Sequence, residues 1–291
     1  MIRGIARLFF KMFWWLFGGV IRWTVTIALL VLVIFLITHF TPLDEFYRAK
    51  AHRLLGNVQG AIYWYEEGLR KHPKGSLSDQ ARYELVLVYL DSVQPHKALY
   101  HLSQCDRLTS EQKRQVLFAL ARAFGLTGDA KKAAEHFRAF AAAFQNDEKA
   151  PEALYRAGEA FSQSGQDKLA IAAWKQCAER YPRSVWTAKS LWALALAEQK
   201  RGNDKAFVKA CRRLSEDHPS TPEAARARWN LTLWHLKKGE RTEAFRWFQT
   251  AVKESPHLIK EWLSSEQASE LLRQFKGTMS DWLSQLPSAG P

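Results

Sequence analysis

The chain has 291 residues, of which 47% are hydrophobic, and its formal net charge is +13 at pH 7. This basic balance suits an acidic protein partner or anionic lipid head groups. No run of five basic residues and no nucleic-acid-binding motif occurs in the sequence, so we expect no nucleic-acid partner.

Residues 1–19 form a basic, amphipathic segment. On a continuous helix its cations and the next one along the chain share one face, because they are separated by near-whole numbers of turns: Arg3, Arg7, Lys11 and Arg22. We expect this membrane-surface segment to lie in the interface, with its cations towards lipid phosphates. The alternative is an ordinary positive flank that forms no helix of its own.

Residues 20–40 contain the most apolar stretch of the chain. Trp23–Phe40 holds 18 residues without a formal charge, and as a helix it would be ~27 Å long, close to the thickness of a bilayer core. This predicts a transmembrane helix. A cleaved signal peptide is the alternative, but the residues after Leu36 lack the small residues of a cleavage site.

Charge around this stretch favours one orientation. Four cations and no acid precede it, and positive flanks tend to stay in the cytoplasm. We therefore expect a single-pass protein of the bacterial inner membrane, with a cytoplasmic amino terminus and the rest of the chain in the periplasm.

The region 41–256 is internally periodic. Glycines recur at a step of 37 residues, and prolines and aromatic residues keep the same step: Gly128, Gly165, Gly202 and Gly239; Pro182, Pro219 and Pro256; Tyr155, Trp192 and Trp229. A fixed period of this length indicates stacked copies of one supersecondary unit. Such arrays usually bind other molecules rather than transform them.

One copy is clearest in Pro151–Pro182. Proline suits the first turn of a helix, where its missing N–H is no loss, and Gly165 ends that helix because glycine tolerates positive φ. A second helix follows and stops at Pro182. Between the two helices, small residues are expected to face bulky ones: Gly158, Phe161, Ala170 and Trp174.

This copy resembles a tetratricopeptide repeat. That family has a small residue at position 8, an aromatic at 11, Ala at 20, an aromatic at 24 and Pro at 32, and these positions are here Gly158, Phe161, Ala170, Trp174 and Pro182. Other copies match less fully. The resemblance implies an all-α solenoid of about six helix-turn-helix repeats over residues 41–256, preceded by the transmembrane helix.

The period is longer than the ~34 residues usual for the family. It is similar to the repeats of bacterial envelope proteins, such as the periplasmic coordinator of the Tol-Pal system and the lipoprotein of the outer-membrane barrel assembly machine. The resemblance also implies that the first helices line a concave groove.

Position 5 of every copy is aromatic, and this position commonly faces the groove in the family. A peptide partner with apolar anchors and acidic neighbours would suit such a ladder flanked by cations. The alternative is that these aromatics pack between repeats. The candidate partner-binding residues are Phe46, Tyr83, Phe118, Tyr155, Trp192 and Trp229, with Arg122, Lys200 and Lys237.

The carboxy-terminal stretch lacks a full repeat. Residues 257–286 are expected to form capping helices, which the last unit of an array needs to cover its apolar face. Residues 287–291 are expected to be disordered.

Catalytic and metal-binding patterns are missing. The sequence has no H-E-x-x-H, C-x-x-C, P-loop, G-x-G-x-x-G or G-x-S-x-G motif, so we expect no enzyme activity, no cofactor and no small-molecule substrate. Three hypotheses for function remain: a membrane-anchored adaptor that binds a protein partner in the envelope, a structural subunit of a larger membrane complex, and a cytoplasm-facing receptor.

Overall fold

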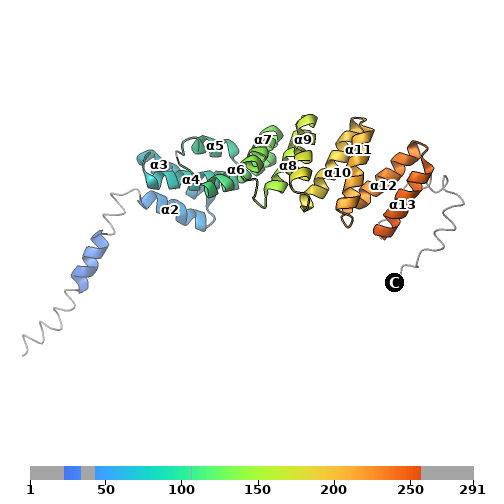
Figure 1. Ribbon diagram of the computed structural model, residues 1–291. Coiled ribbons are helices and arrows are strands. Elements are labelled where there is room, and N and C mark those ends of the chain that lie inside the picture. Colours follow the sequence, from blue (N-terminus) through green and yellow to red (C-terminus); the bar gives the residue numbers. More distant parts are fainter. Residues whose placement is uncertain (1–22, 34–42, 106, 257–291) are drawn as a thin grey trace, which may run out of the picture. The chain divides into compact units, whose positions relative to one another are not determined.

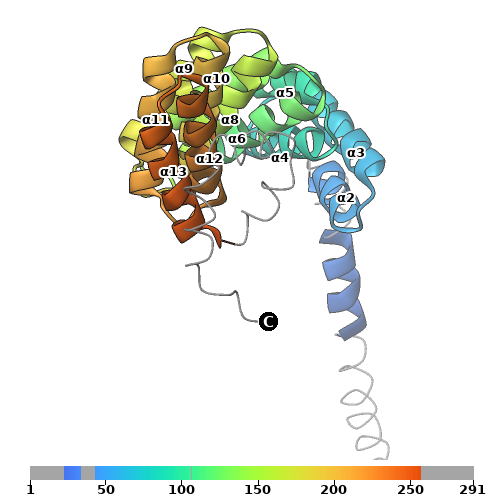
Figure 2. The ribbon, with the colours of Figure 1, turned by 90° about the vertical axis from the view of Figure 1, so that its right-hand side faces the viewer.

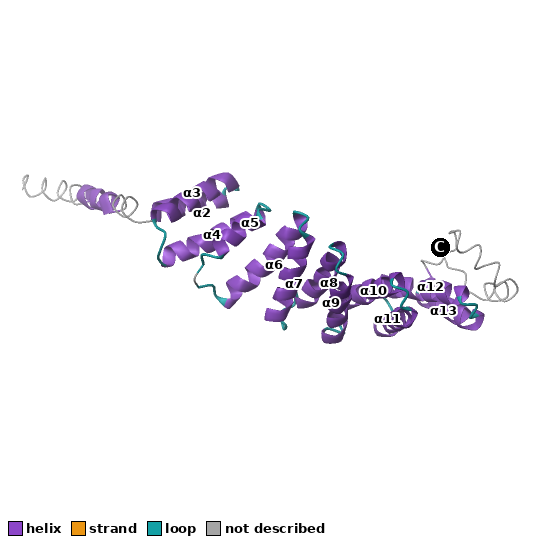
Figure 3. Ribbon diagram, turned by 90° about the horizontal axis from the view of Figure 1, so that it is seen from above, coloured by secondary structure: helices purple, strands orange, loops and turns teal. Residues whose placement is uncertain are grey.

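The computed structural model describes residues 23–33, 43–105 and 107–256. In these ranges the chain is all helix and loop (Figure 3). The described helices over residues 43–254 follow one another as six pairs, which makes the fold a solenoid of stacked helix-turn-helix repeats (Figure 1). The chain divides into two compact units, one ending at Ala123 and one beginning at Phe124.

The first unit contains two complete helix pairs. Helix α2 (Leu43–Leu54) packs against α3 (Val58–Lys71), and α4 (Ser76–Asp91) packs against both α3 and α5 (Pro95–Leu102). The following helix, α6 (Ser110–Leu126), runs across the boundary between the two units.

The second unit continues the series with seven described helices. These are α7 (Ala130–Ala143), α8 (Ala150–Gln163), α9 (Asp167–Arg180), α10 (Val185–Lys200), α11 (Asp204–Asp217), α12 (Pro222–Lys237) and α13 (Arg241–Glu254). Helix α10 packs against α8 and α12 as well as against its neighbours α9 and α11. In Figure 2, the first helices α8, α10 and α12 lie together, with the second helices α9, α11 and α13 to their left.

The turn within each repeat explains the glycine period. Gly128, Gly165, Gly202 and Gly239 all have φ between +71° and +82°, a region that L side chains rarely adopt. Several second helices then begin with a side-chain cap, in which an Asn or Asp accepts a hydrogen bond from the backbone N–H three residues on. The capping residues are Asn57, Asp129 and Asn203.

Paired helices approach closely where a small residue meets a large one. A Cβ added at Gly158 would overlap the indole of Trp174, whose Nε1 donates to the Tyr155 carbonyl at 3.2 Å. Thirty-seven residues on, the equivalent positions hold Ala195 and Cys211, both fully buried. From one repeat to the next, the residue of the first helix becomes larger (Gly158 to Ala195) while the residue it faces on the second helix becomes smaller (Trp174 to Cys211).

Polar groups close the other end of the repeat. The Thr187 hydroxyl donates to the Tyr181 carbonyl at 2.5 Å, beyond the end of α9. In the last described repeat, a buried guanidinium also satisfies acceptors at and beyond the end of the preceding helix. Arg228 is 1% exposed and donates to the Ser215 hydroxyl and to the Pro219 carbonyl, both at 2.8 Å. Burial lowers the pKa of this guanidinium. Cations near a helix carboxy terminus complement its dipole.

Most of the amino-terminal expectations lie outside the described residues. Residues 23–33 are helical and their side chains are exposed. No helix within the described ranges is both long and apolar enough to cross a bilayer. The basic segment 1–19 with Arg22, the remainder of the 20–40 stretch and residues 257–291 cannot be compared with the structure.

The contact between Gly158 and Trp174 makes a stability prediction. Gly158→Ala should destabilise the protein by about 1–3 kcal/mol, because overpacking forces the helices apart. Gly125→Ala is the matched control, since an added Cβ there meets only Ala133 at an ordinary distance of 3.9 Å. This control should gain about 0.5–1 kcal/mol from helix propensity.

Urea unfolding followed by circular dichroism would measure both variants. Equal effects of the two substitutions would contradict the view that Gly158 is required by the indole of Trp174.

Candidate peptide-binding surfaces

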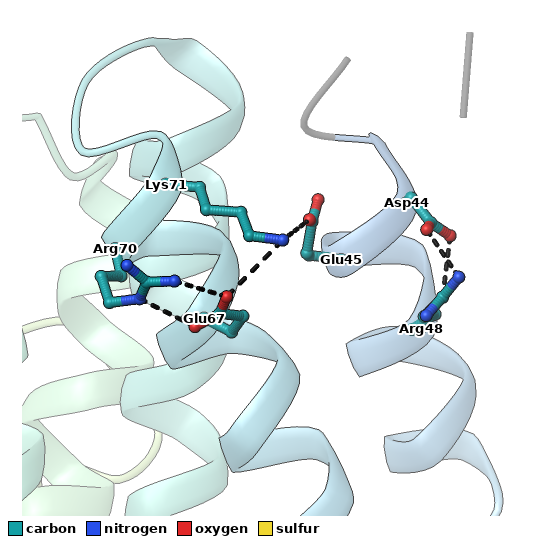
Figure 4. Close-up of polar contacts among 6 residues, drawn as sticks. All are labelled: Asp44, Glu45, Arg48, Glu67, Arg70 and Lys71. Carbon is teal, nitrogen blue, oxygen red and sulfur yellow. Dashed lines mark hydrogen bonds and ion pairs between the residues drawn. The ribbon is translucent and has the colours of Figure 1, made fainter. Parts of the chain in front are cut away.

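Ion pairs hold the first helix of the array in place. The Lys71 ammonium of α3 contacts the Glu45 carboxylate of α2 at 2.8 Å, and Arg70 forms two hydrogen bonds with Glu67 on the same helix (Figure 4). Burial raises the pKa of Glu45, but the hydrogen bond from Lys71, a backbone hydrogen bond and the charge of Lys71 together outweigh it, so the pKa is lowered. This pair therefore fixes α2 against α3.

The same two helices position the first predicted aromatic. Gly68 of α3 is buried, and a Cβ added there would overlap the ring of Phe46 on α2. Phe46 lines a pocket of about 130 Å³ between α2, α3 and α4, and we call it the Phe46 pocket. A cavity of ~150 Å³ can hold one benzene ring, so this pocket has room for about one ring or aliphatic side chain. Its lining residues are Phe46, Tyr47, Lys50, Tyr65, Leu77, Gln80, Ala81 and Glu84.

The rim of the Phe46 pocket is both apolar and charged. Tyr47 is 66% exposed and Leu77 is 47% exposed. At its base the Tyr65 phenol donates to the Glu84 carboxylate at 2.5 Å. Burial, followed by this hydrogen bond, raises the pKa of Tyr65, so the phenol keeps its proton and remains a donor.

A second surface lies on the first helices of the second unit. The Tyr155 ring on α8 lies 5.4 Å from that of Trp186 on α10. The Lys189 ammonium is 4.4 Å from the centre of the Trp186 ring, and the Arg156 guanidinium is 5.8 Å from it. With Glu159, these residues form what we call the Tyr155 cluster.

Hydrogen bonding fixes the Tyr155 cluster. The Tyr155 phenol donates to the Glu159 carboxylate at 2.8 Å. Burial raises the pKa of this phenol, the hydrogen bond to Glu159 raises it further, and the charge of Glu223 on α12 adds to both. Residues from three successive first helices thus contribute to one electrostatic environment.

The structure does not treat the six predicted position-5 aromatics alike. Tyr83, Phe118 and Trp229 are buried, with 7–9% of each side chain exposed. Phe46, Tyr155 and Trp192 are partly exposed. The first three are therefore packed between helices, whereas the other three can be reached from solvent.

The predicted cations of the groove all reach solvent. Arg122, Lys200 and Lys237 are exposed, and no described acid forms an ion pair with any of them. None belongs to the Phe46 pocket or to the Tyr155 cluster.

The sequence pattern did not reveal three exposed or partly exposed apolar residues that line these surfaces. Tyr47, Leu77 and Trp186 do not recur at the repeat period. The residue 37 positions after Trp186, for example, is Glu223. A search for aromatics that depart from the repeat would have found Tyr47 and Trp186.

Two of the three cysteines, Cys177 and Cys211, are buried packing residues, whereas Cys105 is partly exposed. No disulfide joins Cys105, Cys177 and Cys211, all of which lie in the described ranges. Burial raises the pKa of the Cys177 thiol, and it raises that of Cys211 to about 12. Both side chains therefore stay protonated at neutral pH and are poor nucleophiles.

Comparison with protein families identifies the repeat. Residues 152–184 and residues 193–259 each match a model of the tetratricopeptide repeat. Over these residues the chain carries tetratricopeptide repeats. Such repeats bind protein and peptide partners and are generally non-enzymatic scaffolds.

Comparison with solved structures finds other arrays of this type. MamA from Desulfovibrio magneticus RS-1 is 18% identical, with a TM-score of 0.42 over 61% of this chain and 95% of that chain. YrrB, described as a tetratricopeptide repeat protein with an unusual peptide-binding site, is 13% identical, with a TM-score of 0.45 over 72% of this chain and 97% of that chain. A comparison with curated proteins gives no match.

Burial divides the aromatics into core and surface, and this division can be tested. Trp229→Ala should cost about 3–5 kcal/mol, because it leaves a large cavity. Trp186→Ala, at a partly exposed position, should cost about 1 kcal/mol or less. Chemical denaturation of the full-length protein in detergent would measure both, and similar losses would contradict the assignment of Trp186 to a surface.

Proposed function

We propose that this protein is a membrane-anchored scaffold that captures a segment of a partner protein on the first helices of its repeats. The observation that carries the proposal is the Tyr155 cluster, where two cations lie within 6 Å of the centre of a partly exposed indole ring. Trp, Tyr and Arg supply most of the binding energy at protein interfaces. Trp186 is not needed to close the repeat, since the residue 37 positions earlier is Lys149 and the residue 37 positions later is Glu223.

The two surfaces suit a partner segment with particular chemistry. An aromatic or aliphatic anchor would fill the Phe46 pocket or stack on Trp186. Acidic neighbours of that anchor would pair with Lys189 and Arg156 at the Tyr155 cluster. Recognition then rests on apolar burial for affinity and on charge for orientation and rate.

The membrane part of the proposal rests on sequence. Residues 20–40 would hold the repeats at the bacterial inner membrane, with Arg3, Arg7, Lys11 and Arg22 against lipid phosphates. The exposed apolar side chains of the helical residues 23–33 support this, because eight large apolar residues are costly to leave in water. Anchoring would raise the effective concentration of the repeats near membrane partners.

Photocrosslinking in living cells would test partner capture. A photoreactive phenylalanine analogue at position 186 should crosslink to one protein species, because this side chain lies in the proposed interface. The control places the analogue at Tyr100, which is 63% exposed on the second helix α5. Equal crosslinking at the two positions, or none at position 186, would argue against a specific surface.

Protease treatment of intact spheroplasts would test topology. With the repeats in the periplasm, a carboxy-terminal tag should be digested while a cytoplasmic control protein survives. Protection of the tag until lysis would reverse the orientation and favour the cytoplasm-facing receptor. Release of the protein from membranes by carbonate washing would contradict the proposed transmembrane anchor.

A further inference from the structure

A further pocket is lined by residues of the second unit alone, and none of these residues belongs to the Phe46 pocket or to the Tyr155 cluster. It has a volume of about 640 Å³ and is lined by α11, the end of α12 and Glu240 in the turn before α13. Sites for ligands of drug size typically have ~300–1,000 Å³. The lining residues of α11 are not those that it buries in the repeat, which include Phe207, Cys211 and Leu214. This face of α11 is therefore available to a partner.

Unpaired positive charge dominates the pocket wall. Lys205, Lys209 and Arg212 follow one another at spacings of four and three residues, so they share a face of α11. No acid in the described part of the chain forms an ion pair with any of these three. Of the acids in the lining, Asp204 pairs with Lys238 at 2.8 Å and Glu240 with His235 at 2.5 Å. Only Glu216 opposes the three cations.

The α12 side of the pocket is lined by Trp234, an aromatic side chain that a hydrogen bond holds in place. The Trp234 indole donates to the Asp204 carboxylate at 3.2 Å, and the Lys238 ammonium lies 5.5 Å from the centre of its ring. Val208 adds an aliphatic surface on α11. His235 is 4% exposed, and its Nε2 has no hydrogen-bond partner in the described structure. The pocket thus offers an apolar surface fixed by hydrogen bonding, beside three cations that form no ion pair within the described residues. One of them, Arg212, also lies 5.9 Å from the centre of the Trp247 ring.

Repeat symmetry shows that the fold does not require this arrangement. Thirty-seven residues before Lys205, Lys209 and Arg212, helix α9 has Lys168, Ala172 and Lys175. The position equivalent to Trp234 is Ala197. Helix α9 forms the same kind of repeat without the third cation and without the indole, so the repeat itself does not require these residues of α11 and α12.

We propose that this pocket binds an acidic segment of a partner protein, with one large apolar side chain of that segment placed against Trp234 and Val208. Charge complementarity selects the acidic residues, which pair with Lys205, Lys209 and Arg212. The apolar surface distinguishes such a segment from an inorganic anion, which gains nothing from an indole. The volume of the site and its aromatic lining favour an inserted side chain over a lipid surface. This would be a second site, independent of the Tyr155 cluster.

A peptide probe tests this site on the full-length protein in detergent. The probe is a fluorescein-labelled peptide in which glutamates flank a single phenylalanine, and binding is followed by fluorescence anisotropy. The variant is Lys205→Glu/Arg212→Glu. The matched control is Lys168→Glu/Lys175→Glu, which makes the same charge change at the equivalent positions of α9.

Affinity should fall about tenfold or more in Lys205→Glu/Arg212→Glu, as expected when close charge pairs across an interface are lost, and should change less than about threefold in the control. A peptide with lysines in place of the glutamates should bind the α11 variant more tightly than the wild type. Replacing the phenylalanine of the probe by alanine should weaken binding to the wild type.

Other results would overturn the proposal. Equal losses in the two variants would mean diffuse attraction to a basic protein. Displacement of the probe by millimolar inorganic phosphate, or by vesicles of phosphatidylglycerol, would assign the cations to small anions or to lipid. Self-association of the wild type that is lost in Lys205→Glu/Arg212→Glu, without peptide binding, would assign the pocket to a second copy of the chain. Circular dichroism of each variant shows that the fold is retained.

Discussion

Close approach of the two helices within a repeat is the constraint on which the array depends. A helix pair that buries one face can stack on the next pair only if the gap between its own helices is filled without strain. In one repeat, the large indole of Trp174 fills the space that Gly158 leaves on the facing helix. In the next repeat, two small buried residues, Ala195 and Cys211, occupy the same positions. The positive-φ glycine of each turn then lets the chain reverse at a constant spacing. These requirements recur, so the sequence that satisfies them recurs as well.

Residues that depart from the period are where binding can evolve. Trp186 has no aromatic counterpart 37 residues away on either side, Lys209 has no cationic counterpart 37 residues before it, and both lie at accessible places on otherwise regular helices. In a solenoid each unit contacts mainly its neighbours, so a local substitution on an outward face costs the array little. The Tyr155 cluster and the α11 pocket use different faces of one scaffold. A scaffold of this kind could hold two segments at once, and linking two sites in one molecule raises their combined affinity.

Buried polar groups show how the repeat ends are closed. In two units the same position is leucine, Leu154 and Leu191, whereas the last described repeat has Arg228. Its guanidinium satisfies the carbonyl of Pro219 and the hydroxyl of Ser215, where a leucine would leave both without this donor. A buried cation without an acid is tolerable here because carbonyl oxygens near the end of α11 carry partial negative charge. In this repeat, hydrogen bonds from Arg228 therefore replace the apolar packing that leucine provides at the same position of two other repeats.

The sequence by itself determined the class of fold. The 37-residue step, the turn glycines and the alternation of small and bulky residues predicted six helix pairs of the tetratricopeptide type, because local propensity and repeat packing act over a few turns of helix. It could not separate surface from core within the aromatic ladder. Trp229 is buried and Tyr155 is partly exposed although both occupy the same position of the repeat, since exposure depends on what the neighbouring helices place beside them. Only the tertiary structure brought Trp186 against Tyr155, or Trp234 beside the cations of α11, because these contacts join residues that no period relates.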